Sequence, residues 1–262
     1  MLQLTRMKKR ILLKRLLSFG LCSGLMLSLY SCKKDNAGAD PSGTDTDLGI
    51  YQKIYGASSV TLDGDYVVIK CTGLPDHKSP YYQGTQWEAE KYEAYNGSNA
   101  NWKQNPDKIA QGNYTFRIPR KPVEAATKSA TPLGPIGVSI NGVPFFNQYA
   151  AQMAPLTNEI NGFDQYGGHP QQQGMYHYHV EPLYLTAHKG KDALMGFLLD
   201  GFPVYGPVEN GVPVTNDMLD AYHGHTQATA DYPGGIYHYH ITSADPYING
   251  NGFYGTPGTV TE

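Results

Sequence analysis

The stretch Tyr176-His177-Tyr178-His179 organises this sequence, because the same string returns as Tyr237-His238-Tyr239-His240, 61 positions later. A Gly-His pair precedes each copy, at Gly168-His169 and at Gly224-His225. The chain has nine histidines, so most of its imidazoles belong to this pattern. We interpret the pattern as a two-fold internal repeat in which each half supplies three histidines.

Each copy of the string has the composition of a β-strand. Tyrosine followed by a β-branched residue favours a strand, and the side chains of a strand alternate between its two faces. His177 and His179 are therefore expected on one face, with Tyr176 and Tyr178 on the other. Two imidazoles about 6.5–7 Å apart along a strand can share one metal ion. Imidazole is a common ligand of zinc, copper, nickel and iron.

This geometry predicts a site for one transition-metal ion or a pair of ions. We expect the segments 174–182 and 235–243 to be neighbouring strands in equivalent environments that share the site. The expected ligands are His177, His179, His238 and His240, completed by His169 and His225. The order of metal affinities favours copper and availability favours zinc. A hydrogen-bonded ladder of tyrosine and histidine without an ion is the alternative.

Three further residues are predicted to lie around the ligands. Asp200 ends the apolar run 196–199, and Asp164 lies just before the first Gly-His pair. Either carboxylate could orient an imidazole from behind, although an aspartate in a turn can equally cap the backbone that follows it. His77 lies in a loop after a predicted strand and could join the same shell. His188 and His223 lack the repeat pattern and are expected at the surface.

The rest of the chain predicts a mainly β domain over residues 49–262. Asn-Gly pairs, 30 glycines and 18 prolines divide it into short apolar or alternating runs. The run 138–140 before Asn141-Gly142 is predicted to be one arm of a tight hairpin. The predicted strands are Tyr66–Cys71, Tyr114–Ile118, Ile136–Ile140, Met175–Val180, Leu194–Leu199 and Ile236–Ile241. We expect a β-sandwich or an irregular barrel with many loops. One or two short helices are predicted, at Gln86–Tyr95 and Val214–Ala221.

The first residues are typical of a lipoprotein precursor. Residues 1–31 carry basic side chains and then an apolar run, which is too short to span a bilayer. The run ends in Leu29-Tyr30-Ser31-Cys32, which resembles a lipobox with Cys32 as the lipidated residue. Residues 32–48 are small and polar and form a predicted flexible tether. We therefore expect an extracytoplasmic lipoprotein of the outer membrane, facing either the periplasm or the cell surface.

Charge and cysteine content narrow the partners. Without residues 1–31 the chain has 14 basic and 23 acidic side chains, a net charge of −9. This balance argues against nucleic acid, which needs a basic surface. The expected partners are the membrane, through Cys32, and the metal ion. Cys71 is then the one cysteine left in the domain, and its place at the end of an apolar strand predicts a buried thiol.

Standard catalytic motifs are absent from the sequence. It contains no Gly-x-Ser-x-Gly, no phosphate-binding Gly-x-x-x-x-Gly-Lys-Ser/Thr and no His-Glu-x-x-His. If the protein is an enzyme, the histidines must carry the chemistry, through a coordination position open to water or dioxygen. Whether it is an enzyme stays open at this point.

The repeated strings resemble the YHYH-domain proteins. Matching phrases include Leu199–Pro207, Gly73–His77, Pro132–Val138 and Asn141–Asn147, so the resemblance extends over about 60 to 256. The family has no agreed activity, and the resemblance implies none. Many relatives carry cysteines near the two Gly-His pairs. Tyr166 and Tyr222 stand in their place here, so a family disulfide is not carried over.

The sequence is compatible with two functions. The first is a lipid-anchored domain that binds copper or zinc through the two Tyr-His-Tyr-His segments. The second is a metal-free surface lipoprotein that binds a carbohydrate, a peptide or another small molecule. Its 21 tyrosines and many amide side chains would suit the contact surface of such a module.

Overall fold

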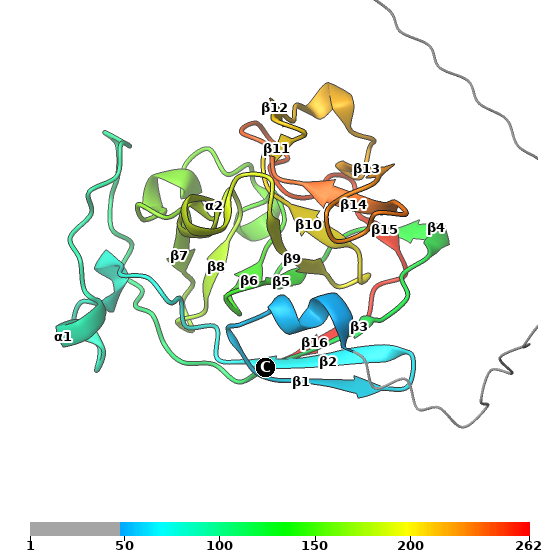
Figure 1. Cartoon of the computed structure of the whole chain (residues 1–262). Helices are drawn as coiled ribbons and strands as arrows, with labels where there is room; N and C mark the ends of the chain where they lie inside the picture. The colour runs from blue at the N-terminus through cyan, green and yellow to red at the C-terminus, as the bar shows by residue number, and fades with distance from the viewer. Residues whose placement is uncertain (1–47) are drawn as a thin grey trace, which may run out of the picture. The chain divides into compact units, whose positions relative to one another are not determined.

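A computed structural model describes residues 48–262 (Figure 1). The predicted signal segment 1–31, Cys32 and the tether up to residue 47 lie outside the described residues. Within residues 48–262, no helix has the length and apolar character that crossing a membrane requires.

The described residues form sixteen strands and two short α-helices. The strands are β1 (Ala57–Asp63), β2 (Tyr66–Cys71), β3 (Tyr114–Pro119), β4 (Glu124–Ser129), β5 (Gly137–Ser139), β6 (Pro144–Phe145), β7 (Gly168–Pro170), β8 (Tyr176–Tyr178), β9 (Leu194–Leu198), β10 (Pro203–Tyr205), β11 (Val208–Glu209), β12 (Val212–Pro213), β13 (Gly224–Gln227), β14 (Ile236–His240), β15 (Phe253–Gly255) and β16 (Thr259–Thr261). The helices are α1 (Glu88–Lys91) and α2 (Leu183–Lys189). Single 3₁₀ turns lie at Gly49–Lys53, Pro80–Tyr82, Ala151–Met153, Glu159–Gly162 and Asn216–Met218.

The smaller sheet has the order β1-β2-β3-β16, seen in the lower part of Figure 1. The strands β2 and β3 alternate between buried and less buried positions, which is the pattern of a sheet with one face on the core. Val67 and Ile69 of β2 and Phe116 of β3 are fully buried. They belong to one apolar core with residues of the larger sheet such as Val138 and Phe197. The two sheets therefore share a core, as predicted for a sandwich.

The larger sheet has eight strands in the order β13-β14-β10-β9-β5-β6-β8-β7. Read outward from the central pair β5 and β9, the two halves have the same strand directions. β6 and β10 run antiparallel to the central strands, β8 and β14 run parallel to β6 and β10, and β7 and β13 are antiparallel again. The sequence repeat is thus a repeat of the fold.

The central pair of strands lies on the approximate two-fold axis that relates the halves. Val138 of β5 is opposite Phe197 of β9, and Gly137 and Ser139 face Leu198 and Gly196 symmetrically about that pair. A Cβ at Gly196 would lie 2.2 Å from the carbonyl oxygen of Val138. Glycine is therefore needed at this position, where the central strands of the two halves pair.

Each half then turns back through an equivalent hairpin. Asn141-Gly142 connects β5 to β6, and Asp200-Gly201 connects β9 to β10. Gly142 has a φ of +79° and Gly201 a φ of +84°, a conformation that side chains other than glycine rarely adopt. The hairpin predicted at Asn141-Gly142 is confirmed.

The mainly β prediction is confirmed, and all six predicted strands are present. The larger sheet ends at β13 on one side and β7 on the other, so the barrel alternative is wrong for the described residues. Of the predicted helices, Gln86–Tyr95 keeps one α-helical turn and Val214–Ala221 only a 3₁₀ turn. The helix α2, which packs against β9, was not predicted.

One prediction about the repeat is wrong. The two Tyr-His-Tyr-His strands, β8 and β14, are not neighbours, because β6, β5, β9 and β10 lie between them. With strands about 4.8 Å apart, this places the two copies on the order of 20 Å from each other. The shared site is therefore excluded, while the expectation of equivalent environments holds.

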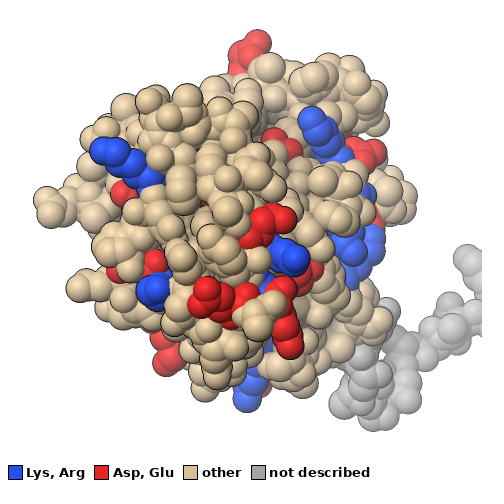
Figure 2. Space-filling view, turned by 90° about the vertical axis from the view of Figure 1, so that its left-hand side faces the viewer, with Lys and Arg blue, Asp and Glu red and all other residues tan. Residues whose placement is uncertain are grey.

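Two surface and core features complete the fold. Cys71 is a free, buried thiol, as predicted, and burial raises its pKa to about 12. Figure 2 shows that charged side chains on the face presented there stand in small separate groups among a mostly uncharged surface.

Candidate metal centres

The Gly-His pair and the Tyr-His-Tyr-His strand form one structural unit in each half. β7 pairs antiparallel with β8 so that His169 faces His177, and β13 pairs with β14 so that His225 faces His238. The preceding glycine allows this pairing. A Cβ at Gly168 would lie 2.5 Å from the ring of Tyr176. The glycine of the motif therefore makes room for the tyrosine of the partner strand.

Pleating separates the two residue types of the motif as predicted. The imidazoles of His177 and His179 meet on one side of β8, with their Nε2 atoms 3.0 Å apart. The rings of Tyr176 and Tyr178 pack edge to face on the other side. All four side chains are buried, and His177 and His179 are only 2 % and 3 % exposed.

The first centre consists of His169, His177 and His179, whose ligand atoms lie within 4.8 Å of one another. Two of the rings are fixed by backbone carbonyls. Nδ1–H of His177 donates to the oxygen of Met175 at 3.0 Å, and Nδ1–H of His179 donates to the oxygen of Asn147 at 2.6 Å. Because a carbonyl can only accept, these contacts place the proton on Nδ1 and leave a lone pair on Nε2.

His169 differs from the other two rings of the first centre. Its Nδ1 atom lies 3.2 Å from the side-chain amide nitrogen of Asn105, and no backbone carbonyl fixes its tautomer. Its Nε2 atom is buried and has no hydrogen-bond partner among the described residues. A buried nitrogen without a partner is costly unless something else binds it.

The second centre repeats this arrangement and adds a carboxylate. The Nε2 atoms of His238 and His240 are 3.1 Å apart, and that of His225 is 3.2 Å from that of His238. Nδ1–H of His238 donates to Ile236 O at 3.0 Å, and Nδ1–H of His240 donates to Gly206 O at 2.9 Å.

Glu209 of β11 is the additional carboxylate of the second centre. Its oxygens lie 3.2 Å from Nε2 of His238, 3.3 Å from that of His225 and 3.6 Å from that of His240. The four residues form one group of possible ligands within 4.8 Å. The donor set is thus three imidazoles and one carboxylate.

Burial favours the neutral form of all three imidazoles of the first centre, and of His238 and His240 in the second. It lowers the pKa of His169 to about 3 and the pKa values of His179 and His240 to about 4. Burial also lowers the pKa of His177 far below its ordinary value, and the neighbouring histidines lower it further. A neutral imidazole is the form that binds a metal ion.

Aromatic rings wall the first centre. Phe146 stacks on His177 at 3.9 Å between ring centroids, and Phe163 lies parallel to His179 at 5.7 Å. Phe163 also packs edge to face against His169 at 4.8 Å. These contacts hold the imidazoles in place and keep water away from their flanks.

The predicted carboxylates Asp164 and Asp200 act on the tyrosine side of the strands. Tyr176 OH donates to Asp164 at 2.9 Å, and Tyr239 OH donates to Asp200 at 2.6 Å. Both aspartates also accept backbone N–H groups two residues further on, the capping role considered as the alternative. The expectation that they orient a ligand imidazole is therefore wrong, because the pleat places them on the opposite face.

The other predicted histidines are distributed differently. Nε2 of His77 lies 3.1 Å from Tyr178 OH, so this buried ring belongs to the tyrosine side and does not join the ligand shell. His188 is exposed, as expected. His223 was expected at the surface, but it is 2 % exposed and its Nε2 lies 3.0 Å from Thr242 Oγ1.

Several residues that contact the imidazoles were not predicted from the sequence. Glu209 lies between the two copies of the motif, with no counterpart of the same kind in the first half of the repeat. The carbonyl oxygens of Met175, Asn147, Ile236 and Gly206 carry no side-chain signal at all. Only the fold brings them to the rings.

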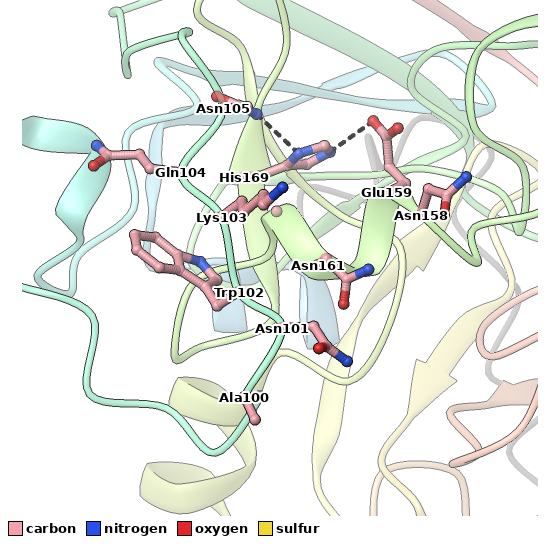
Figure 3. A pocket seen from close by; sticks show the side chains of 11 residues that line it. Ala100, Asn101, Trp102, Lys103, Gln104, Asn105, Asn158, Glu159, Asn161 and His169 are labelled. Atoms are coloured by element: carbon pink, nitrogen blue, oxygen red, sulfur yellow. Dashed lines mark hydrogen bonds and ion pairs between the residues drawn. The ribbon is translucent and has the colours of Figure 1, made fainter.

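A cavity of about 800 Å³ opens beside the first centre (Figure 3). Its wall includes His169 and Glu159, and an oxygen of Glu159 lies 3.4 Å from Nε2 of His169. The remaining lining is formed by Ala100, Asn101, Trp102, Lys103, Gln104, Asn105, Asn158, Asn161 and Gly162. A smaller cavity of about 180 Å³ touches Glu209 and His240 of the second centre.

Comparison with known families supports the resemblance seen in the sequence. Residues 115–215 match the model of the family described as YHYH protein. The matched segment contains both hairpins and the first Tyr-His-Tyr-His copy, and the second copy lies beyond it. No curated protein and no solved structure matches the chain.

Proposed function

We propose that this protein binds two transition-metal ions per chain, one at each histidine centre, with zinc or copper as the metal. Three convergent imidazoles in each half support the proposal. The ions are bound separately, since the two centres belong to strands far apart in the larger sheet.

The contact between His177 and His179 carries this proposal. Both rings donate Nδ1–H to a carbonyl, so their Nε2 atoms face each other across 3.0 Å with two lone pairs and no proton between them. Such a contact is repulsive unless a positive species lies close to both nitrogens. His238 and His240 make the same contact at 3.1 Å, which argues against an accident of one site.

A metal ion fits between these nitrogens better than an additional proton does. Burial lowers the pKa of every ring in question, so a proton is disfavoured near neutral pH. Zinc binds imidazole nitrogen at about 2.0–2.1 Å, and a tetrahedral ion therefore holds two nitrogens roughly 3.3–3.4 Å apart. The observed separations need only a few tenths of an ångström of movement to accept it.

We further propose that the domain is anchored to the outer membrane through lipidated Cys32. The basic and apolar residues before Cys32 support this. Mass spectrometry of the native protein should find a lipidated Cys32 at the mature N-terminus. An intact N-terminus or an unmodified Cys32 would overturn this part.

Metal content tests the metal proposal. Protein purified from its own compartment should contain two equivalents of zinc or copper by elemental analysis. His177→Ala should remove one equivalent, His238→Ala the other, and the double variant both. His188→Ala changes an exposed histidine outside the centres and should keep two. Circular dichroism of each variant separates loss of the ion from loss of the fold.

A metal-free binding module is the second candidate function. The large polar cavity favours it, because the lining residues would suit an uncharged ligand whether or not an ion is present. Wild-type protein that binds neither zinc nor copper more tightly than the double variant does, by calorimetry, would leave this candidate in place of the metal proposal.

A further inference from the structure

We infer that the two centres have diverged, the first into a site that binds an outside ligand and the second into a closed structural site. The ligand class that fits the first is a neutral polyhydroxylated molecule such as an oligosaccharide. This inference rests on the proposed metal function. It adds that the two ions have different roles and that a ligand of this class binds at the first centre.

The position of the acidic residue separates the two centres. Glu209 reaches all three imidazoles of the second centre, at 3.2–3.6 Å from their Nε2 atoms, and its side chain is only 13 % exposed. Three imidazoles and this carboxylate complete a tetrahedral set, which is the closed form typical of structural zinc sites.

The first centre has no such fourth ligand within the described residues. Glu159 approaches only His169, at 3.4 Å, and its side chain is 38 % exposed. The group of possible ligands there consists of the three histidines alone. An ion held by three imidazoles keeps a position for water or for an incoming ligand.

That open position lies beside a large cavity. His169 and Glu159 both lie in the wall of the cavity of about 800 Å³ (Figure 3). The buried Nε2 atom of His169 has no hydrogen-bond partner among the described residues, and its one charged neighbour there is the carboxylate of Glu159 at 3.4 Å. A volume of this size accommodates a ligand of several sugar units. The cavity at the second centre is about 180 Å³, and Glu209 itself forms part of its wall.

The chemistry of the large cavity indicates the ligand class. Five carboxamide side chains line it, and each offers both a donor and an acceptor, which matches hydroxyl groups. Lys103 and Glu159 are its only ionisable side chains besides His169, and their charges oppose each other. The wall is therefore close to neutral and does not favour a strongly charged ligand.

Trp102 supplies the aromatic component of the same wall. Its ring stacks on Tyr95 at 4.3 Å with an interplanar angle of 2°, so a second ring supports it. Its Nε1–H is buried without a hydrogen-bond partner among the described residues. A fixed indole ring with a free donor, beside amide groups, suits a sugar ring with its hydroxyls.

The open coordination position is tested with cobalt(II) in place of the native ion and azide as the probe. The full-length variant His238→Ala/His240→Ala retains the first centre, and His177→Ala/His179→Ala retains the second. Azide should change the visible absorption of the first variant and leave that of the second unchanged. Adding Glu209→Ala to the second variant should create a response to azide.

The outcomes of this experiment distinguish failure of the metal-binding proposal from failure of the proposed difference between the two centres. A protein that binds no cobalt at either centre contradicts the metal proposal and the inference together. Cobalt bound at both centres with equal responses to azide, or with no response at either, contradicts only the divergence of the two.

The ligand class is tested by calorimetry of the zinc-loaded protein with cellotetraose, maltotetraose and chitotetraose. At least one should bind, and Trp102→Ala should weaken it by tenfold or more. Trp102→Phe keeps an aromatic ring and should lose less. Absence of heat with all three sugars, or equal binding by Trp102→Ala, would overturn the assignment.

Discussion

Tyr239 donates a hydrogen bond of 2.6 Å to Asp200, the aspartate in the turn of the second central hairpin. In the first half, the equivalent Tyr178 accepts a hydrogen bond of 3.1 Å from the amide of Asn141, in the equivalent turn. The tyrosines of the motif therefore tie each outer strand to the hairpin in the middle of the sheet. The histidines on the opposite face are positioned by this link.

Asp200→Ala should destabilise the fold without removing a metal ion. The change leaves Tyr239 OH and the N–H of Gly255 without their acceptor, at a cost of about 3 kcal/mol in the free energy of unfolding. Thermal or urea unfolding measures this cost, and elemental analysis should still find two ions. Loss of one ion with unchanged stability would mean that Asp200 serves the metal after all.

The pH dependence of Asp200→Asn should reveal the protonation of this carboxyl. Burial raises the pKa of Asp200 to about 6, from 3.8 in the unfolded chain. The carboxyl therefore contributes its stability below pH 3.8 and loses it as the pH rises through about 6. Relative to wild type, Asp200→Asn should gain stability over this window, by at most about 1.4 kcal/mol per pH unit. A constant difference between pH 4 and 7 would contradict the raised pKa.

Gly168→Ala should destabilise the first half of the sheet. The added methyl group would overlap the ring of Tyr176, and overpacking of this kind costs about 1–3 kcal/mol. Gly234→Ala is the matched control, because nothing lies within 4 Å of a Cβ there. Chemical unfolding of both variants checks the prediction, which fails if the two are equally stable.

Zinc retention should persist to a lower pH than free imidazole would allow. An ordinary histidine has a pKa near 6.5, but burial lowers those of His179 and His240 to about 4. Protons therefore compete for these two ligands only as the pH falls toward about 4. Zinc content after equilibration between pH 7 and 4 measures this, with tryptophan fluorescence reporting the fold. Release centred on pH 6.5 from folded protein would show that the ligands are not buried.

Asn105→Asp should tighten metal binding at the first centre. A carboxylate at this position could accept Nδ1–H of His169 and fix the tautomer that leaves Nε2 free for the ion. Such partners typically change metal affinity by about 10-fold or more. Competition with a chromophoric chelator, using the variant that retains only the first centre, measures the change. Weaker or equal binding would exclude a ligand role for Nε2 of His169.

The sequence by itself determined the local structure of both centres. Alternation along Tyr176–His179 was enough to place the two imidazoles on one face and the two tyrosines on the other, because a strand's pleat has a period of two. Asn141-Gly142 likewise determined a hairpin, since its glycine can adopt the positive φ of the turn. The six strands followed from short runs, some alternating and some wholly apolar, between turn residues.

Tertiary structure decided how the copies are combined. Strand order depends on contacts across the whole sheet, so the string itself could not show that β5 and β9 would pair in the middle and separate β8 from β14. For the same reason the sequence predicted one shared metal site, whereas the fold contains two separate histidine centres. Glu209 and the carbonyls of Asn147 and Gly206 reach the histidines only through folding, because nothing in their local sequence records which ring lies beside them.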